Sequence, residues 1–146
     1  MHAYTDRSTN EVHLALTKGE ICADKETLVR VHEPLTVLDF LDPSSGRHSF
    51  SLDQARHALS NADCGVIVLL RRPETCHDIL AALVEQSPTQ RPAAKWDPRM
   101  YGIGAQILRD LGVRKMKLLA SPRRMPSMTG FDLEVTGYIS SPAEFE

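Results

Sequence analysis

Cysteine is scarce in this chain of 146 residues, which contains only Cys22, Cys64 and Cys76. Because their number is odd and no short spacing is repeated, the sequence predicts neither a disulfide framework nor a zinc ribbon. Free thiols persist in reducing compartments, so we expect a cytoplasmic protein.

Long apolar runs are also missing. No run approaches the length of about 18 residues that a membrane-spanning helix requires, and the N-terminus carries no charged and then apolar leader. The sequence therefore predicts no membrane span and no signal peptide. The first expected strand begins almost at Met1, and we expect this start to mark the boundary of a piece excised from a longer two-domain protein.

Charge of one sign is likewise lacking, because the formal net charge is only −2. Binding to nucleic acid depends on a basic surface that releases counterions, so we expect no nucleic-acid partner. Basic residues do gather in one stretch, at Arg114, Lys115, Lys117, Arg123 and Arg124. Such a run is typical of a solvated strand edge and loop, and an anion site is the alternative.

Hydrophobic residues make up 42% of the chain and charged residues 25%, proportions typical of a globular domain. A domain of this length buries enough surface to fold without a disulfide or a metal. Segments with strand patterns alternate with helical ones, so we expect one α/β layered domain over residues 1–146.

Six segments carry the apolar patterns of strands. They are residues 3–6, 13–17, 28–32, 65–70, 115–120 and 133–139. The first two are predicted to form a hairpin. The uninterrupted apolar run of residues 65–70 predicts a strand that is covered on both faces, at the centre of the sheet.

Three segments, residues 52–59, 74–86 and 98–111, have the apolar spacing of helices, and the third carries a stripe that is expected to be buried. Asp97 is a good N-cap for the third helix, which Gly112 is expected to end. The polar stretch that follows the second helix, residues 87–92, predicts a flexible loop.

Residues 97–113 read DPRMYGIGAQILRDLGV, which resembles the signature D-x-R-x-Y-G-I-G-A-Q-I-L-x-D-L-G-V of the GTP cyclohydrolase II family of riboflavin biosynthesis. Shorter segments at residues 13–19, 28–32, 114–119 and 130–135 are similar to further family motifs. The resemblance thus covers nearly the whole chain. It implies a three-layer α/β/α domain with a mixed β-sheet.

Domains of this family commonly follow a 3,4-dihydroxy-2-butanone 4-phosphate synthase domain in one polypeptide. The resemblance therefore implies a longer protein that is an enzyme through its synthase domain. It also implies two partners, which are the synthase domain of the same polypeptide and a second copy of the chain in a homodimer.

The chemistry of the family depends on a zinc ion that three cysteine thiolates hold and that activates a water to open the imidazole ring of GTP. The family places its first cysteine just after R-V-H, where this chain has Pro34, and the other two in R-C-D-C-G, where it has His48 and Phe50. Proline and phenylalanine cannot bind zinc, and one imidazole does not hold it. We therefore predict no metal, no cofactor and no catalytic residues.

A rescued metal site would need Cys64, Cys76 or His77 to converge on His48 from other elements. Small buried cysteines are ordinary core residues, and Cys64 precedes the central strand. We therefore expect His48 to be an exposed or packed histidine without ligand partners.

The segment after the central strand also departs from the family, whose glycines there let backbone amides and an arginine approach the triphosphate. This chain keeps Arg71 but continues with Pro73, which lacks an amide donor, and with Glu74 and Asp78, which add negative charge.

One pair of family residues survives, as Asp97 and Arg99. The resemblance assigns this pair the roles of proton acceptor and of attacking or phosphate-contacting arginine. Without zinc the pair is expected to be vestigial. The favoured interpretation is that Asp97 is the N-cap of the long helix and Arg99 a residue of its first turn.

The sequence leaves three interpretations of function. The favoured one is a catalytically silent domain that acts as a structural, dimerisation or regulatory module. The second is a binding domain that senses a nucleotide or a sugar phosphate through Arg30, Arg71, Arg99, Arg123 and Arg124. The third is a working hydrolase with an altered metal site.

Overall fold

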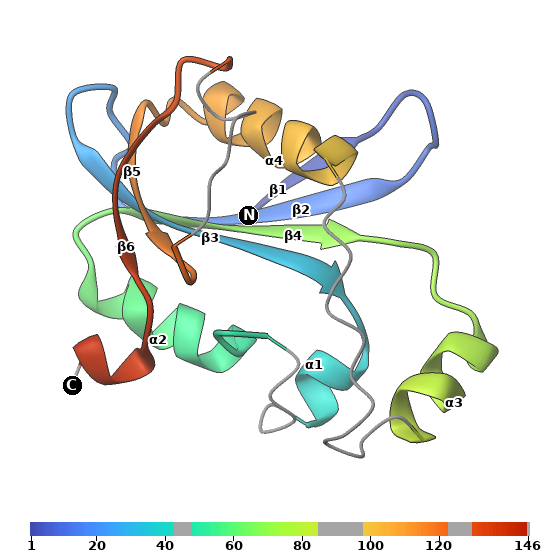
Figure 1. Cartoon of the computed structure of the whole chain (residues 1–146). Coiled ribbons are helices and arrows are strands. Elements are labelled where there is room, and N and C mark those ends of the chain that lie inside the picture. Colours follow the sequence, from blue (N-terminus) through green and yellow to red (C-terminus); the bar gives the residue numbers. More distant parts are fainter. Residues whose placement is uncertain (43–47, 85–97, 123–129, 146) are drawn as a thin grey trace.

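The computed structural model describes residues 1–42, 48–84, 98–122 and 130–145, and these form a sheet with helices on both faces (Figure 1). The strand order is β1-β2-β4-β3-β5-β6, and the sheet is mixed as predicted. The pairs β1–β2 and β2–β4 are antiparallel, whereas β3–β4, β3–β5 and β5–β6 are parallel. The strands are β1 (His2–Thr5), β2 (Val12–Lys18), β3 (Glu26–Leu35), β4 (Gly65–Arg71), β5 (Lys115–Leu119) and β6 (Glu134–Ile139).

The helices confirm the predicted three layers. They are α1 (Leu38–Leu41), α2 (Leu52–Asn61), α3 (Cys76–Val84), α4 (Pro98–Asp110) and the 3₁₀ helix η1 (Pro142–Phe145). Helix α4 covers one face of the sheet, and α1 and α2 lie on the other, while α3 lies apart from the sheet (Figure 1). Within the described ranges, no helix combines the length and the apolar character that crossing a bilayer requires.

Strand β4 is the centre of the domain, as its apolar run predicts. Successive side chains of a strand point to opposite faces. Val66 and Leu70 pack in the core beneath α4 together with Leu108, whereas Ile67 packs in the second core with Phe50 of the α2 side. Two separate apolar cores therefore hold the sheet between its helices.

Strand β3 follows the same alternation, and this decides where its polar residues lie. Val29 belongs to the core beneath α4, and Leu28 belongs to the core beneath α2. Arg30 and His32 share the face of Leu28, because they follow it at intervals of two residues. Both are buried polar residues, so the α2 side of the sheet carries a guanidinium and an imidazole inside the domain.

Local capping fixes the ends of the two long helices. The Ser51 hydroxyl accepts the backbone N–H of Gln54, whose side chain accepts the N–H of Ser51, and this capping box begins α2. Gly112 ends the α4 segment at a φ of 91°, where the N–H groups of residues 112 and 113 bond to Arg109 and Leu108 carbonyls. The predicted stop at Gly112 is thereby confirmed, whereas the predicted N-cap Asp97 and the loop at residues 87–92 lie outside the described residues.

Candidate functional site

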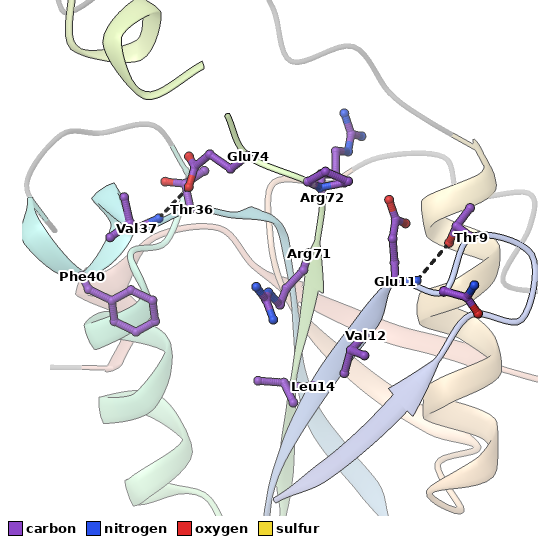
Figure 2. Close-up of a pocket in the computed structure, with 12 residues that line it drawn as sticks. Thr9, Glu11, Val12, Leu14, Thr36, Val37, Phe40, Arg71, Arg72 and Glu74 are labelled. Atoms are coloured by element: carbon purple, nitrogen blue, oxygen red, sulfur yellow. Dashed lines mark hydrogen bonds between the residues drawn. The ribbon is translucent and has the colours of Figure 1, made fainter. Parts of the chain in front are cut away.

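An open groove lies at the end of β4, and Figure 2 shows its lining. It encloses about 770 Å³ between the start of β2, the segment that leads into α1 and residues 71–74. The Arg71 side chain lies within it, near Phe40 on one side and Val12 on the other. Among the described residues no hydrogen bond or ion pair of the Arg71 guanidinium occurs. The groove therefore presents the Arg71 guanidinium between Phe40 and Val12, in a lining that is otherwise mixed polar and apolar.

Two acidic residues, Glu11 and Glu74, also line this groove, and Glu74 is engaged with the protein itself. A carboxylate oxygen of Glu74 accepts the backbone N–H of Val37 at 3.3 Å. Arg72 forms an ion pair with Glu33. Since Pro73 has no N–H to donate, the segment after β4 offers fewer amide donors to a phosphate than a glycine-rich loop would.

Two histidines and an aspartate meet near the same end of the sheet. Asp39 Oδ2 lies 3.1 Å from His32 Nε2, and Asp39 Oδ1 lies 3.3 Å from His48 Nε2. The two imidazole rings are 4.0 Å apart between centroids. The exposed fractions of the side chains are 0% for His32, 4% for Asp39 and 13% for His48. Strand β3, helix α1 and the segment before α2 each contribute one residue.

The surroundings of Asp39 and His32 set the charge states of these two residues. Burial alone would raise the pKa of Asp39, but the contacts with His32 and His48 and the N–H of Thr36 lower it below its usual range. Burial lowers the pKa of His32, and the nearby carboxylate offsets only part of this effect. At neutral pH the cluster therefore holds an ionised carboxylate beside a neutral, buried imidazole.

The prediction that His48 has no ligand partners is wrong. Sequence reasoning searched for cysteines, and it missed His32 because a strand pattern explained that residue, and Asp39 because no pattern marked its four-residue helix. Cys64, Cys76 and His77, the residues considered as alternative ligands, do not join His48 among the described residues. Cys64 is buried near the start of β4, where its thiol donates to the Glu26 carbonyl at 3.5 Å.

The arginines predicted to bind a ligand do not converge within the described part of the chain. Arg30 is only 5% exposed and donates to the carbonyls of Leu119 at 2.8 Å and Phe50 at 3.2 Å. Arg71 lines the groove of Figure 2. Arg99 pairs with Asp6 at 2.9 Å beside a different cavity. Asp97, Arg123 and Arg124 lie outside the described residues, so their predicted roles stay predictions.

A second cluster brings Asp6, Glu11 and His13 together, and sequence reasoning missed it as well. Its histidine is buried, and its Nδ1 accepts the backbone N–H of Arg71 at 3.1 Å. Burial lowers the pKa of His13, so the ring is neutral and carries its proton on Nε2. The lone pair of Nδ1 is then used by this hydrogen bond and Nε2 carries the proton, without a hydrogen-bond partner among the described residues, so neither nitrogen offers a lone pair to a metal.

Comparison with known proteins agrees with the motifs in the sequence. Residues 1–140 match the family model described as GTP cyclohydrolase II. A 3,4-dihydroxy-2-butanone 4-phosphate synthase of Neisseria meningitidis serogroup B is 46% identical over 94% of the chain. The protein of the same name from Pseudomonas aeruginosa is 44% identical over 97% of the chain, and the riboflavin biosynthesis protein RibBA of Aquifex aeolicus is 36% identical over 92%.

These relatives are much longer than the chain. The matched region covers 37% of the Neisseria protein, 38% of the Pseudomonas protein and 36% of the Aquifex protein. The chain therefore corresponds to well under half of the length of each.

Proposed function

Because the chain belongs to the GTP cyclohydrolase II family, we propose that it has lost GTP ring opening and serves as a structural and dimerisation module. Its setting would be riboflavin biosynthesis, beside a 3,4-dihydroxy-2-butanone 4-phosphate synthase domain of the same polypeptide. The names and the greater length of its relatives support this setting.

The observation that carries the proposal is the dispersal of the thiols. Cys22 is half-buried before β3, Cys64 is buried before β4 and Cys76 is exposed at the start of α3. Phe50, which replaces one expected ligand, is fully buried in the core beneath α2. The tri-thiolate zinc site of the family therefore does not fit this chain, and the Lewis acid that would activate water lacks its support.

An unpartnered apolar helix supports the role as a contact module. Helix α3 has no buried residue, and it leaves Leu80, Leu83 and Val84 60%, 45% and 80% exposed. A helix of this length is marginal in water without tertiary packing. Large exposed apolar groups on one short helix are typical of a protein contact surface. We assign this surface to the synthase domain, since most of each relative's length lies outside the matched region.

The proposal predicts that the chain does not release formate from GTP. With zinc and magnesium present, the rate should equal that of buffer, at least about a millionfold below a typical enzyme rate. An active GTP cyclohydrolase II measured in the same buffer provides the control. Formate release that a chelator abolishes would contradict the proposal.

The contact surface predicts a second result in the full-length polypeptide. Leu83→Glu should raise the rate of proteolytic cleavage between the domains about tenfold or more, because docking would bury an apolar side chain worth about 1.5–3 kcal/mol. His57→Glu places the same charge at an exposed position of α2 and should leave the cleavage rate unchanged. Equal cleavage of the two variants would remove α3 from the interface.

A sensing domain is the second candidate function, and Arg71 in the open groove favours it. Its guanidinium can bind the phosphate of a nucleotide or sugar phosphate while the rest of the ligand contacts Val12 and Phe40. Titration calorimetry with GTP, ribulose 5-phosphate and flavin nucleotides separates this function from a purely structural one.

A further inference from the structure

We propose that His32, Asp39 and His48 bind one divalent transition-metal ion, with Zn²⁺ as the representative probe. This site differs in its donor atoms from a tri-thiolate site. It also goes beyond the proposed function, because it needs no nucleotide and assigns the ion no role in ring opening.

The distances within the cluster suit such an ion. Zinc binds imidazole nitrogen and carboxylate oxygen at about 2.0–2.2 Å, which at tetrahedral angles separates neighbouring donors by about 3.3–3.5 Å. The nitrogen–oxygen separations are 3.1 Å from His32 Nε2 to Asp39 Oδ2 and 3.3 Å from His48 Nε2 to Asp39 Oδ1, so each imidazole meets its own oxygen of the carboxylate. The donor atoms of all three residues lie within 4.8 Å of one another. Small side-chain rotations therefore suffice to place one ion among them.

The donor set selects a class of ion. Two imidazoles and one carboxylate favour zinc and neighbouring transition metals, whereas magnesium and calcium prefer oxygen ligands alone. Three protein donors leave the other coordination positions of the ion to water. The low exposure of all three side chains limits competition from bulk solvent.

The unsatisfied state of His32 is the second, independent observation. Its side chain is fully buried, yet neither Nδ1 nor Nε2 has a hydrogen-bond partner among the described residues. Its Nε2 has a single polar contact in the described part of the chain, with Asp39 Oδ2 at 3.1 Å, and Nδ1 has none. Leaving a buried polar atom unpartnered is costly. A metal ion would use the Nε2 lone pair, which already points toward the carboxylate of Asp39.

The ion would connect three separate elements. His32 belongs to β3, Asp39 to α1 and His48 to the segment before α2. Helix α1 and the residues before it form a wall of the groove in Figure 2, through Thr36, Val37 and Phe40. Metal binding should therefore fix α1, whose four residues make too short a helix to persist without support.

Zinc competition with a chromophoric chelator tests the site on the untagged chain after metal has been stripped from it. We expect one zinc per chain, and a dissociation constant that rises at least about 100-fold in His48→Ala and in Asp39→Asn. The control His57→Ala removes an exposed histidine of α2 and should bind zinc as the unaltered chain does. Zinc should also raise the melting temperature of the unaltered chain and leave that of His48→Ala unchanged.

Cobalt substitution identifies the donors directly. The Co²⁺ spectrum should show d–d bands without thiolate charge transfer, because the site contains no cysteine. Circular dichroism checks that each variant folds, and His48→Asn replaces His48→Ala if the smaller side chain disrupts packing. Three results would overturn the proposal: no stoichiometric zinc at tenfold excess, equal loss in His57→Ala, or a thiolate band. None of them depends on GTP turnover, so this site and the proposed function can fail separately.

Discussion

Arg30→Met is expected to lower the free energy of unfolding by about 3 kcal/mol, because it removes charged donors from buried carbonyls. The guanidinium joins β3 to the Leu119 carbonyl at the end of β5 and to the Phe50 carbonyl before α2. It also lies over the Phe50 ring, with Cζ 5.9 Å from the centroid. Methionine can fill part of the volume of the arginine stem, but it donates nothing to these groups.

Urea denaturation of the two variants Arg30→Met and Arg71→Met measures this difference. Arg71 is exposed in the groove, and its replacement should change stability by no more than about 0.5 kcal/mol. The pair therefore separates a structural arginine from one that is available to a ligand. If Arg30→Met were as stable as the unaltered chain and lost binding of a phosphate ligand, its sequence-based assignment to a binding site would be restored.

The strands and long helices could be predicted because each depends on a local pattern. The apolar run of residues 65–70 indicates a strand covered on both faces, and β4 occupies Gly65–Arg71 between two cores. The spacing of apolar residues in residues 98–111 likewise predicts α4. The apolar run shows only that both faces of the strand are covered, whereas the three-layer order is implied by the resemblance to the GTP cyclohydrolase II family.

The histidine–aspartate cluster could not be predicted because no local pattern brings its members together. His32 looks like any residue of an alternating strand, and Asp39 lies in a helix of four residues that carries no periodicity. The proximity of His48 to His32 and Asp39 depends on the tertiary fold, because His48 lies in the segment that connects α1 to α2. At the three positions where the family has cysteines, His48 is the only residue with a metal-binding side chain, so these positions offer it no partner.

Burial of polar residues on β3 connects the fold with both proposals. The alternation that places Leu28 in the core beneath α2 also places Arg30 and His32 inside the domain. Arg30 finds carbonyl partners there, whereas among the described residues His32 has only the contact of Nε2 with Asp39. The same face of the strand therefore contains one polar residue that the fold explains and one at which we propose an additional ligand.

Gly19→Ala is expected to destabilise the domain by at least about 3 kcal/mol. Gly19 follows β2 with a φ of 70°, a conformation that alanine adopts only at a cost of about 1–2 kcal/mol. A Cβ atom there would also lie 2.1 Å from the backbone oxygen of Asp63. This oxygen belongs to the turn that leads into β4, so relieving the clash would move the central strand away from β2.

The neighbouring contacts leave little room for such a movement. Lys18 donates to the carbonyls of Ser60 and Ala62, the latter at 2.8 Å, and holds β2 against the end of α2. Gly102→Ala is the matched control, because a Cβ at that position of α4 meets no atom within 4 Å. Alanine there should leave stability equal or raise it by up to about 1 kcal/mol, through its higher helix propensity. Equal urea midpoints for the two variants would show that the chain at Gly19 can move away from the Asp63 oxygen, which would otherwise lie 2.1 Å from the added Cβ atom. A loss of stability confined to Gly19→Ala would establish the close approach of β2 to the start of β4 as a requirement of the fold.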